Sequence, residues 1–178
     1  MSEIAEAVLD SSVIAALFFN DPCSESAERF VLGLGTAYTL DLAVAEVSNV
    51  AWKRIKFFGE DYGKVKELLK MAVRFIDEVC VSFSSREIYE EALAIGVEIS
   101  ESVYDALFIA LAEKLKVKLA TCDEKLGNKL KNTRLGETVL VLKPGNPLNI
   151  EHPPRATSTS SQCNNGSKEG NRWKSGEP

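Results

Sequence analysis

The sequence predicts an α/β fold, a three-layer α/β/α sandwich with a central, mostly parallel sheet. Two observations predict it. Over the first 145 residues, short apolar runs alternate with longer segments whose apolar residues recur at helical spacing, and this alternation is typical of βα units. The short runs are hydrophobic throughout, which is expected for strands of a sheet that is covered on both faces.

The expected elements follow one another in βα order. Strands are expected at the short apolar runs, which are residues 7–9, 36–40, 79–83, 117–121 and 138–142. Helices are expected where apolar residues recur every three or four positions, which are residues 13–19, 24–34, 42–57, 62–76, 84–95, 102–115 and 123–131.

Turn and cap residues support these boundaries in the first half of the chain. Asn20-Asp21-Pro22 is a turn signal that ends the first helix, and Gly33 and Gly35 end the second. Asp41 can cap the third helix, which Phe57-Phe58-Gly59 breaks. We expect the apolar face of this helix to consist of Leu42, Ala45, Val50, Ala51 and Ile55.

The second half of the chain has similar signals. Ser84 or Ser85 caps the helix after the third strand, and Ser102-x-x-Asp105 resembles a capping box at the start of the next helix. Lys143-Pro144-Gly145 closes the last strand. Residues 146–178 are rich in Pro, Ser, Asn and Gly and have few apolar residues, so we expect one folded domain over 1–145 and a disordered tail over 146–178.

Composition limits the class of protein. With 178 residues and 45% hydrophobic content, the chain fits one soluble domain with a substantial core. No apolar run approaches the roughly 20 residues that a membrane-spanning helix needs. The N-terminal segment has acids but no basic stretch, which is unlike a secretory signal. We therefore expect a cytoplasmic protein without a membrane partner.

Cysteine and histidine usage excludes several chemistries. Cys23, Cys80, Cys122 and Cys163 are far apart and form no CxxC pair, which argues against structural zinc and a thioredoxin-like motif. We expect Cys80 and Cys122 to be buried free thiols. The single histidine, His152, lies in the Pro-rich tail, so histidine triads and histidine metal sites are nearly excluded.

The charge pattern leaves a nucleic-acid partner open. A net charge of −5 at first argues against one, but basic residues cluster at Lys53, Arg54 and Lys56 and again between residues 114 and 134. A solvated helix face and a rim that faces phosphates both explain these clusters.

Four carboxylates stand out because they lie in or beside apolar segments. Asp10 ends the first strand, Glu46 lies within LDLAVAEVSNV, Asp105 lies within SESVYDALFIALAEKL, and Asp123 follows the strand that ends at Thr121. Each has a simpler explanation: three of them can cap helices, and Glu46 can reach solvent at a helix edge.

Taken together, the four acids are expected to converge. Three lie at the edge of a parallel sheet where the strands end, which is where ligands bind in open α/β sheets, and the fourth lies on a helix that follows another strand. A cluster of carboxylates without cations would raise its own pKa values. Its oxygen-only ligands suit magnesium or manganese better than zinc.

At this point the sequence resembles a known family. The segments VLDSSVIAALF, AEVSNV, SVYDALFIALAEKL and LATCDEKL, in that order, resemble the four motifs of PIN-domain ribonucleases, above all the VapC-type toxins of toxin–antitoxin pairs. The resemblance covers roughly residues 7–142. It implies an α/β/α sandwich and metal-dependent endonucleolytic cleavage of RNA. It also implies a homodimer and a small antitoxin partner.

The resemblance also implies roles for individual residues. Asp10, Glu46, Asp105 and Asp123 would hold Mg²⁺ or Mn²⁺, and Thr121 would steady a ligand or a metal-bound water. One or two such ions would activate water and stabilise charge on a phosphodiester. Because the predicted core has no histidine, we expect 5′-phosphate and 3′-hydroxyl products.

Two matters stay open at this level. Lys53, Arg54 and Lys56 would grip the RNA backbone or would only form a solvated helix face. The chain would be a nuclease or a non-catalytic PIN-like module that binds RNA or protein. Large side chains that remain exposed would mark an antitoxin or dimer surface, and the candidates are Phe18, Phe19, Trp52, Phe57 and Phe58.

Overall fold

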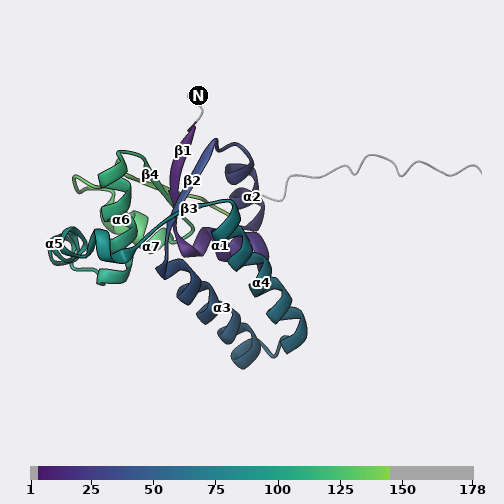
Figure 1. Ribbon diagram of the computed structural model, residues 1–178. Helices are drawn as coiled ribbons and strands as arrows, with labels where there is room; N and C mark the ends of the chain where they lie inside the picture. Colours follow the sequence, from purple (N-terminus) through teal and green to yellow (C-terminus); the bar gives the residue numbers. More distant parts are fainter. Residues whose placement is uncertain (1–3, 145–178) are drawn as a thin grey trace, which may run out of the picture. The chain divides into compact units, whose positions relative to one another are not determined.

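A fully parallel, five-stranded sheet forms the centre of the protein (Figure 1). The computed structural model describes residues 4–144. The strands are β1 (Glu6–Leu9), β2 (Thr36–Leu40), β3 (Val81–Phe83), β4 (Lys118–Thr121) and β5 (Val139–Val141). Their order across the sheet is β3-β2-β1-β4-β5, so β1 is central and lies between β2 and β4. The predicted α/β sandwich with a parallel sheet is confirmed.

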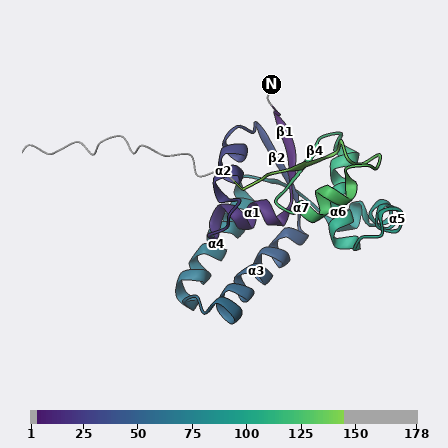
Figure 2. The ribbon, with the colours of Figure 1, turned by 180° about the vertical axis from the view of Figure 1, so that it is seen from behind.

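Helices cover both faces of this sheet. They are α1 (Ser11–Phe18), α2 (Ser24–Leu32), α3 (Leu42–Phe58), α4 (Tyr62–Glu78), α5 (Tyr89–Ile99), α6 (Val103–Leu115) and α7 (Glu124–Leu130). Helix α1 packs against α2, α3 and α4 on one side, and α6 packs against α5, β1 and β4 on the other. Figure 2 shows the two groups on either side of β1 from behind. No helix between residues 4 and 144 is long and apolar enough to cross a membrane.

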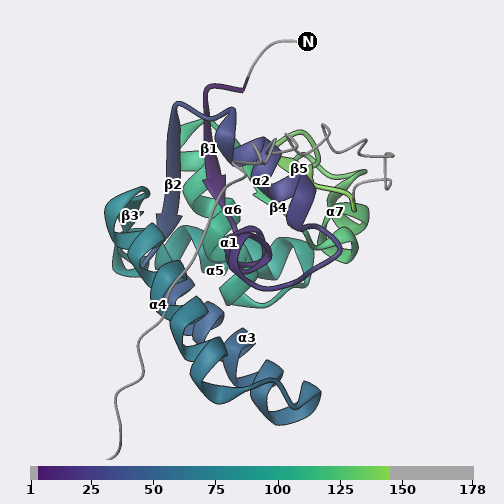
Figure 3. The ribbon, with the colours of Figure 1, turned by 90° about the vertical axis from the view of Figure 1, so that its right-hand side faces the viewer.

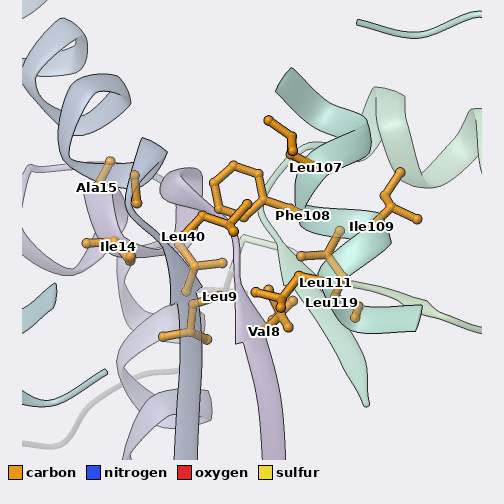
Figure 4. Close-up of a cluster of buried hydrophobic side chains, with 14 of the residues drawn as sticks. Val8, Leu9, Ile14, Ala15, Leu40, Leu107, Phe108, Ile109, Leu111 and Leu119 are labelled. Carbon is orange, nitrogen blue, oxygen red and sulfur yellow. The ribbon is translucent and has the colours of Figure 1, made fainter. Parts of the chain in front are cut away.

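The core lies where the central strands meet α6 and α1. The side chains of Val8 and Leu9 on β1 and of Leu119 on β4 are completely buried. In α6 every residue from 106 to 112 is buried, and Figure 4 shows Phe108 and Leu111 of this helix against the strand residues. Burying each such side chain stabilises the fold by roughly 1.5–3 kcal/mol. This packing fixes the strand ends from which the candidate site is built.

Helices α3 and α4 pack against each other as a long hairpin (Figure 3). The predicted end of α3 is close to the observed one, but Phe57 and Phe58 remain helical. Gly59 ends the helix because it adopts the left-handed conformation, with φ at 68°, which a side chain would strain. The buried face of α3 carries Ala43, Val47 and Ala51, whereas Ala45, which we expected in the apolar set, is exposed.

The segment after β3 differs most from the prediction of one helix over 84–95. A 3-10 turn, η1 (Ser85–Glu87), comes first, with Ser84 and Glu87 forming a capping box. The backbone of Ile88, with φ at −144° and ψ at 11°, interrupts the helical path, and α5 then runs to Ile99. The short range of the capping signal explains the difference, because a cap fixes one turn and not the length of the helix.

Asp41 also differs from its predicted role. It stands at the N-cap position of α3, but its side chain makes no cap hydrogen bond. Its carboxylate instead accepts hydrogen bonds from the Ser85 amide at 3.0 Å and from the hydroxyls of Ser84 and Ser85. Burial acts to raise the pKa of Asp41, but these hydrogen bonds outweigh it and hold the pKa below its usual range.

The predicted tail, 146–178, lies outside the described residues.

Candidate functional site

The site begins where β1 and β4 end side by side. Leu9 pairs with Ala120, and the Asp10 amide extends the ladder by donating to the Ala120 carbonyl at 3.0 Å. This register brings Asp10 next to Thr121. The Thr121 hydroxyl donates to Oδ2 of Asp10 at 2.6 Å, and the Ser12 hydroxyl donates to the same oxygen at 2.6 Å. Two hydroxyls from different elements therefore orient the Asp10 carboxylate.

Helix capping does not explain the Asp10 side chain. The residue occupies the N-cap position of α1, and its carbonyl accepts the first helical hydrogen bonds from Val13 and Ile14. Its carboxylate makes no cap hydrogen bond. Besides Ser12 and Thr121, its donor is the Ser11 hydroxyl, at 3.2 Å. The side chain faces the end of β4 and is free of a helical role.

Thr121 links two of the predicted acids. Its side chain is completely buried. While its hydroxyl donates to Asp10, the same oxygen accepts a hydrogen bond from the Asp123 amide at 3.0 Å. A single hydroxyl thus sets the distance between the Asp10 side chain and the turn that carries Asp123.

Asp123 has the capping role that we considered as its simpler explanation. Its Oδ1 accepts hydrogen bonds from the amides of Lys125 at 2.7 Å and Leu126 at 3.1 Å at the start of α7. The side chain is exposed. Capping holds one carboxylate oxygen, and among residues 4–144 no hydrogen bond reaches the other oxygen. Capping and ligand binding are therefore compatible at this residue.

Asp105 lies in the first turn of α6 and is half-buried. The Ser102 hydroxyl donates to Oδ2 of Asp105 at 2.8 Å and accepts from the Asp105 amide at 3.3 Å. The second of these hydrogen bonds is the predicted helix cap. Burial raises the pKa of the Asp105 carboxyl, and the charges of Asp10, Glu101 and Asp123 raise it further, against the hydrogen bond from Ser102.

Glu46 comes from α3 and is also half-buried. Burial raises the pKa of its carboxyl, and the nearby charges of Asp10 and Asp105 add to this effect, while a hydrogen bond from the Ser11 side chain lowers it. The carboxylates of Asp10, Glu46 and Asp105 are therefore close enough to repel one another. Within residues 4–144 no lysine or arginine forms an ion pair with any of the four predicted acids.

The donor set fits magnesium or manganese by its chemistry. The groups that converge are carboxylates and hydroxyls, which are the oxygen ligands that these ions prefer. Among the described residues, however, no three acidic, cysteine or histidine side chains are gathered closely enough to form a complete metal site. One carboxylate oxygen of Asp105 accepts a hydrogen bond from Ser102, and one of Asp123 accepts from the α7 amides.

The predicted basic residues have different environments. Lys53 and Lys56 are exposed on α3. Arg54 is largely buried: it pairs with Glu60 at 2.7 Å, donates to the Asn20 carbonyl, and lies over the Phe19 ring, 5.5 Å from its centre. Arg54 therefore holds α3 to the turn after α1.

The aromatic residues that we considered as candidates for an exposed surface differ in burial. Phe19 is buried and Phe18 is half-buried, so both belong to the packing of α1. Trp52, Phe57 and Phe58 are exposed near the end of α3, and the rings of Trp52 and Phe57 meet edge to face with centres 5.2 Å apart.

Sequence reasoning missed the role of Ser12 at this site. Its hydroxyl donates to Asp10 and accepts from the Cys122 amide at 3.0 Å, so it fastens α1 to the end of β4. The local signal was a serine two residues after the acid, but its partner is 110 residues away. Beside it lies an open pocket of about 640 Å³, whose lining includes Ser12, Asp123 and Lys125.

Comparison with known proteins identifies the family of this chain. A family model described as PIN domain matches residues 7–131. The chain belongs to the PIN domain family. The matched range of this PIN domain contains all four predicted acids and Thr121.

Two relatives of this PIN domain extend the comparison. It is 38% identical to Ribonuclease VapC3 from Pyrobaculum aerophilum over 124 residues, which are 68% of this chain and 92% of that protein. Its fold is similar to the crystal structure of PAE2754 from Pyrobaculum aerophilum, with a TM-score of 0.56 and 22% sequence identity. That match covers 71% of this chain and 80% of the other. The second likeness concerns the fold alone.

Proposed function

We propose that this PIN domain is a metal-dependent endoribonuclease, the toxin of a toxin–antitoxin pair, and that it hydrolyses RNA phosphodiesters. Mg²⁺ or Mn²⁺ would be held by Asp10, Glu46, Asp105 and Asp123. One observation carries the proposal: the half-buried carboxylates of Asp10 after β1, Glu46 on α3 and Asp105 on α6 repel one another without a cation partner among the described residues. The relative named Ribonuclease VapC3 supports the choice of RNA as substrate.

The residues of this chain would each have a distinct part. When bound, a divalent ion supplies an activated water and stabilises negative charge on the phosphoryl oxygens. Thr121 and Ser12 keep the Asp10 carboxylate in one orientation. Partial burial of Glu46 and Asp105 makes their uncompensated charges costly and favours a divalent cation between them.

Two features of the chain bear on how RNA is held and cut. Lys53 lies seven residues after Glu46 on α3, almost two helical turns, so it shares the face of the helix that carries the acid. We propose Lys53 and Lys56 as contacts to the RNA backbone and leave out Arg54, which is engaged within the fold. Since residues 4–144 contain no histidine, imidazole-assisted attack by the 2′-hydroxyl is disfavoured, and we expect 5′-phosphate and 3′-hydroxyl products.

A paired assay tests this function. The full chain and its Asp10→Asn variant would be incubated with a structured RNA in Mg²⁺, in Mn²⁺ and in excess EDTA, and the product ends would be mapped. We expect metal-dependent cleavage by the wild type and a loss of roughly 100- to 1000-fold in the variant. Because the carboxylate and the amide have the same shape, the melting temperature Tm should change by only a few degrees.

Two outcomes would overturn the proposal in different ways. Cleavage that persists undiminished in EDTA, or equally in both proteins, would exclude the mechanism. If neither protein cut RNA but Mn²⁺ raised the Tm of the wild type alone, the acids would bind metal in a non-catalytic module.

A homodimer is the second part of the proposal. Tyr89, Leu93 and Val97 recur every four residues on α5 and are 58%, 55% and 74% exposed, so they form one apolar stripe. A two-fold axis would let this stripe pack on its own copy. Light scattering should give a dimer for the wild type and for Leu32→Glu, a control at an exposed leucine on α2, but a monomer for Leu93→Glu. A monomeric wild type would contradict this part.

An antitoxin partner also remains a prediction, and we assign it to the end of α3. Trp52, Phe57 and Phe58 are exposed there beside Lys53 and Lys56. Apolar anchors flanked by positive charge favour a partner segment with hydrophobic and acidic residues. Such a segment would also cover Lys53 and so remove a contact to RNA. A cytoplasmic location stays a prediction of the sequence.

A further inference from the structure

Two cysteines that are far apart in the sequence meet beside the site. Cys23 stands at the start of α2, and Cys122 lies between Thr121 and Asp123 at the end of β4. Their Sγ atoms are 2.6 Å apart, although the residues are separated by 99 positions. A covalent S–S bond is about 2.05 Å long, so the two sulfurs are only about half an ångström from bonding distance.

The backbone on both sides holds this approach in place. The Cys23 amide donates to Oδ1 of Asp21 at 2.8 Å, and the Cys23 carbonyl accepts from the Ala27 amide at 2.9 Å in the first turn of α2. The Cys122 amide donates to the Ser12 hydroxyl at 3.0 Å. Both residues are thus positioned by backbone hydrogen bonds that do not involve their sulfurs.

We propose that Cys23 and Cys122 form a reversible disulfide that ties the turn between α1 and α2 to the junction of β4 and α7. Small disulfides such as oxidised glutathione would serve as the oxidant. The Cys122 sulfur attacks one glutathione sulfur and releases one glutathione thiol. The Cys23 sulfur then attacks Cys122 and releases the second. Two S–H bonds are lost, one S–S bond forms in the protein, and the oxidant is reduced to two thiols.

The surroundings explain how the reagent reaches the pair. Both cysteines line the pocket of about 640 Å³ beside Ser12 and Asp123. Cys122 is half-buried, whereas Cys23 is only 3% exposed, so Cys122 is the thiol that meets the oxidant first. In the reduced form, Cys23 Sγ donates to the Leu142 carbonyl at 3.2 Å, a contact that the disulfide gives up.

The link would act mainly on stability. It closes a loop of about 100 residues, and loops of that size restrict the unfolded chain strongly. For a domain of this size we expect the oxidised protein to melt roughly 10 °C above the reduced protein. Because glutathione and thioredoxin keep most cytosolic thiols reduced, a disulfide here would make stability depend on the redox state.

Peptide mapping and melting curves test the link directly. The full chain with Cys163→Ser, which removes the cysteine of the tail, would be incubated at pH 8.5 with oxidised glutathione or with a reductant. Free thiols would then be alkylated in denaturant. Trypsin releases Cys23 within residues 1–29 and Cys122 within residues 119–125. We expect these two peptides to be joined in the oxidised sample, with a mass 2 Da below their sum.

Matched variants separate the link from general effects of oxidation. Cys80 is buried and, among residues 4–144, makes no sulfur–sulfur contact, so Cys80→Ser should keep the joined peptides and the higher Tm. In Cys23→Ala and Cys122→Ala the Tm should be the same in oxidant and reductant. The proposal is overturned if both thiols are alkylated after oxidation, if either joins glutathione or another cysteine instead, or if the Tm of the joined form is unchanged. The peptide map of the parent protein decides the first two points even where a variant does not fold.

Discussion

Two groups of acids in this protein have opposite surroundings. On the side of α5, α6 and the segment before β5, Arg134 pairs with Glu98 at 2.9 Å and with Glu113 at 2.5 Å. At the end of β1, the donors to the Asp10 carboxylate within residues 4–144 are all hydroxyls, and its negative charge raises the pKa values of Glu46 and Asp105. The same residue types are thus compensated in one region and left uncompensated in the other.

The pKa directions express this difference. The hydrogen bonds that Arg134 donates to Glu98 and Glu113 raise the pKa of Arg134, so the opposite charges in that cluster stabilise one another. Burial and repulsion raise the pKa values of Glu46 and Asp105, so ionising them costs free energy. Half-buried acids that repel one another, in a fold that pairs Glu98 and Glu113 with Arg134, indicate a place for a ligand rather than a contribution to stability.

The largest expected effect compares one acid from each group. Asp105→Asn should lower metal-dependent RNA cleavage by roughly 100- to 1000-fold, because a metal ligand contributes several kcal/mol to the transition state. Glu113→Gln should leave cleavage within about twofold and reduce stability by up to about 1 kcal/mol, since the Arg134 pair is largely exposed. Initial rates and urea unfolding measure both. Equal losses of activity in the two variants would show that the acids of the candidate site and the acids paired with Arg134 do not differ in function.

A smaller effect concerns the hydroxyl that orients Asp10. Thr121→Val should reduce cleavage by roughly 10- to 100-fold, as is typical when a residue that orients a metal ligand is lost. Thr121→Ser keeps the hydroxyl and should recover most of the rate. Thr39 is the matched control, because it is also completely buried and donates to the Leu9 carbonyl at 3.0 Å. Thr39→Val should cost about 1 kcal/mol of stability without this loss of rate. Similar cleavage rates in Thr39→Val and Thr121→Val would contradict a positioning role for Thr121.

The smallest expected effect is a pH-dependent difference in stability between the Glu46→Gln variant and the wild type. The pKa of Glu46 in the folded protein lies above its value of about 4.3 in the unfolded chain. Its contribution to folding is therefore complete below that value and is lost as the pH rises through the raised pKa. In EDTA, Glu46→Gln should be more stable than the wild type at pH 7.5, by a few degrees in Tm at most, and the gap should close toward pH 4. Glu113→Gln should be less stable than the wild type at pH 7.5, because it loses its ion pair with Arg134. A wild type that is the more stable protein at pH 7.5 would refute the repulsion.

Much of the fold could be predicted because its signals are local. The apolar run before Asp10 and the helical spacing around Phe108 reflect burial on both faces of a sheet and in a central helix. The start of the helix after β3 was misplaced because a local capping signal marks one turn, here the 3-10 turn Ser85–Glu87, and does not encode the break at Ile88.

For the candidate site, the sequence by itself determined which chemistry is available. It provides four acids in apolar segments, a threonine two residues before the last of them, and no histidine before residue 152, which together favour an oxygen-ligand metal site over histidine chemistry. These conclusions need only residue types and spacing along single strands and helices.

The tertiary structure alone decided which side chains share that site and which are used elsewhere. The register of β1 with β4 brings Asp10 to Thr121, 111 residues later, and joins Ser12 to the same network. Packing withdraws Arg54 from the surface to pair with Glu60 and brings Cys23 to Cys122. Each of these contacts depends on how distant segments pack in three dimensions, and no local periodicity encodes such a meeting.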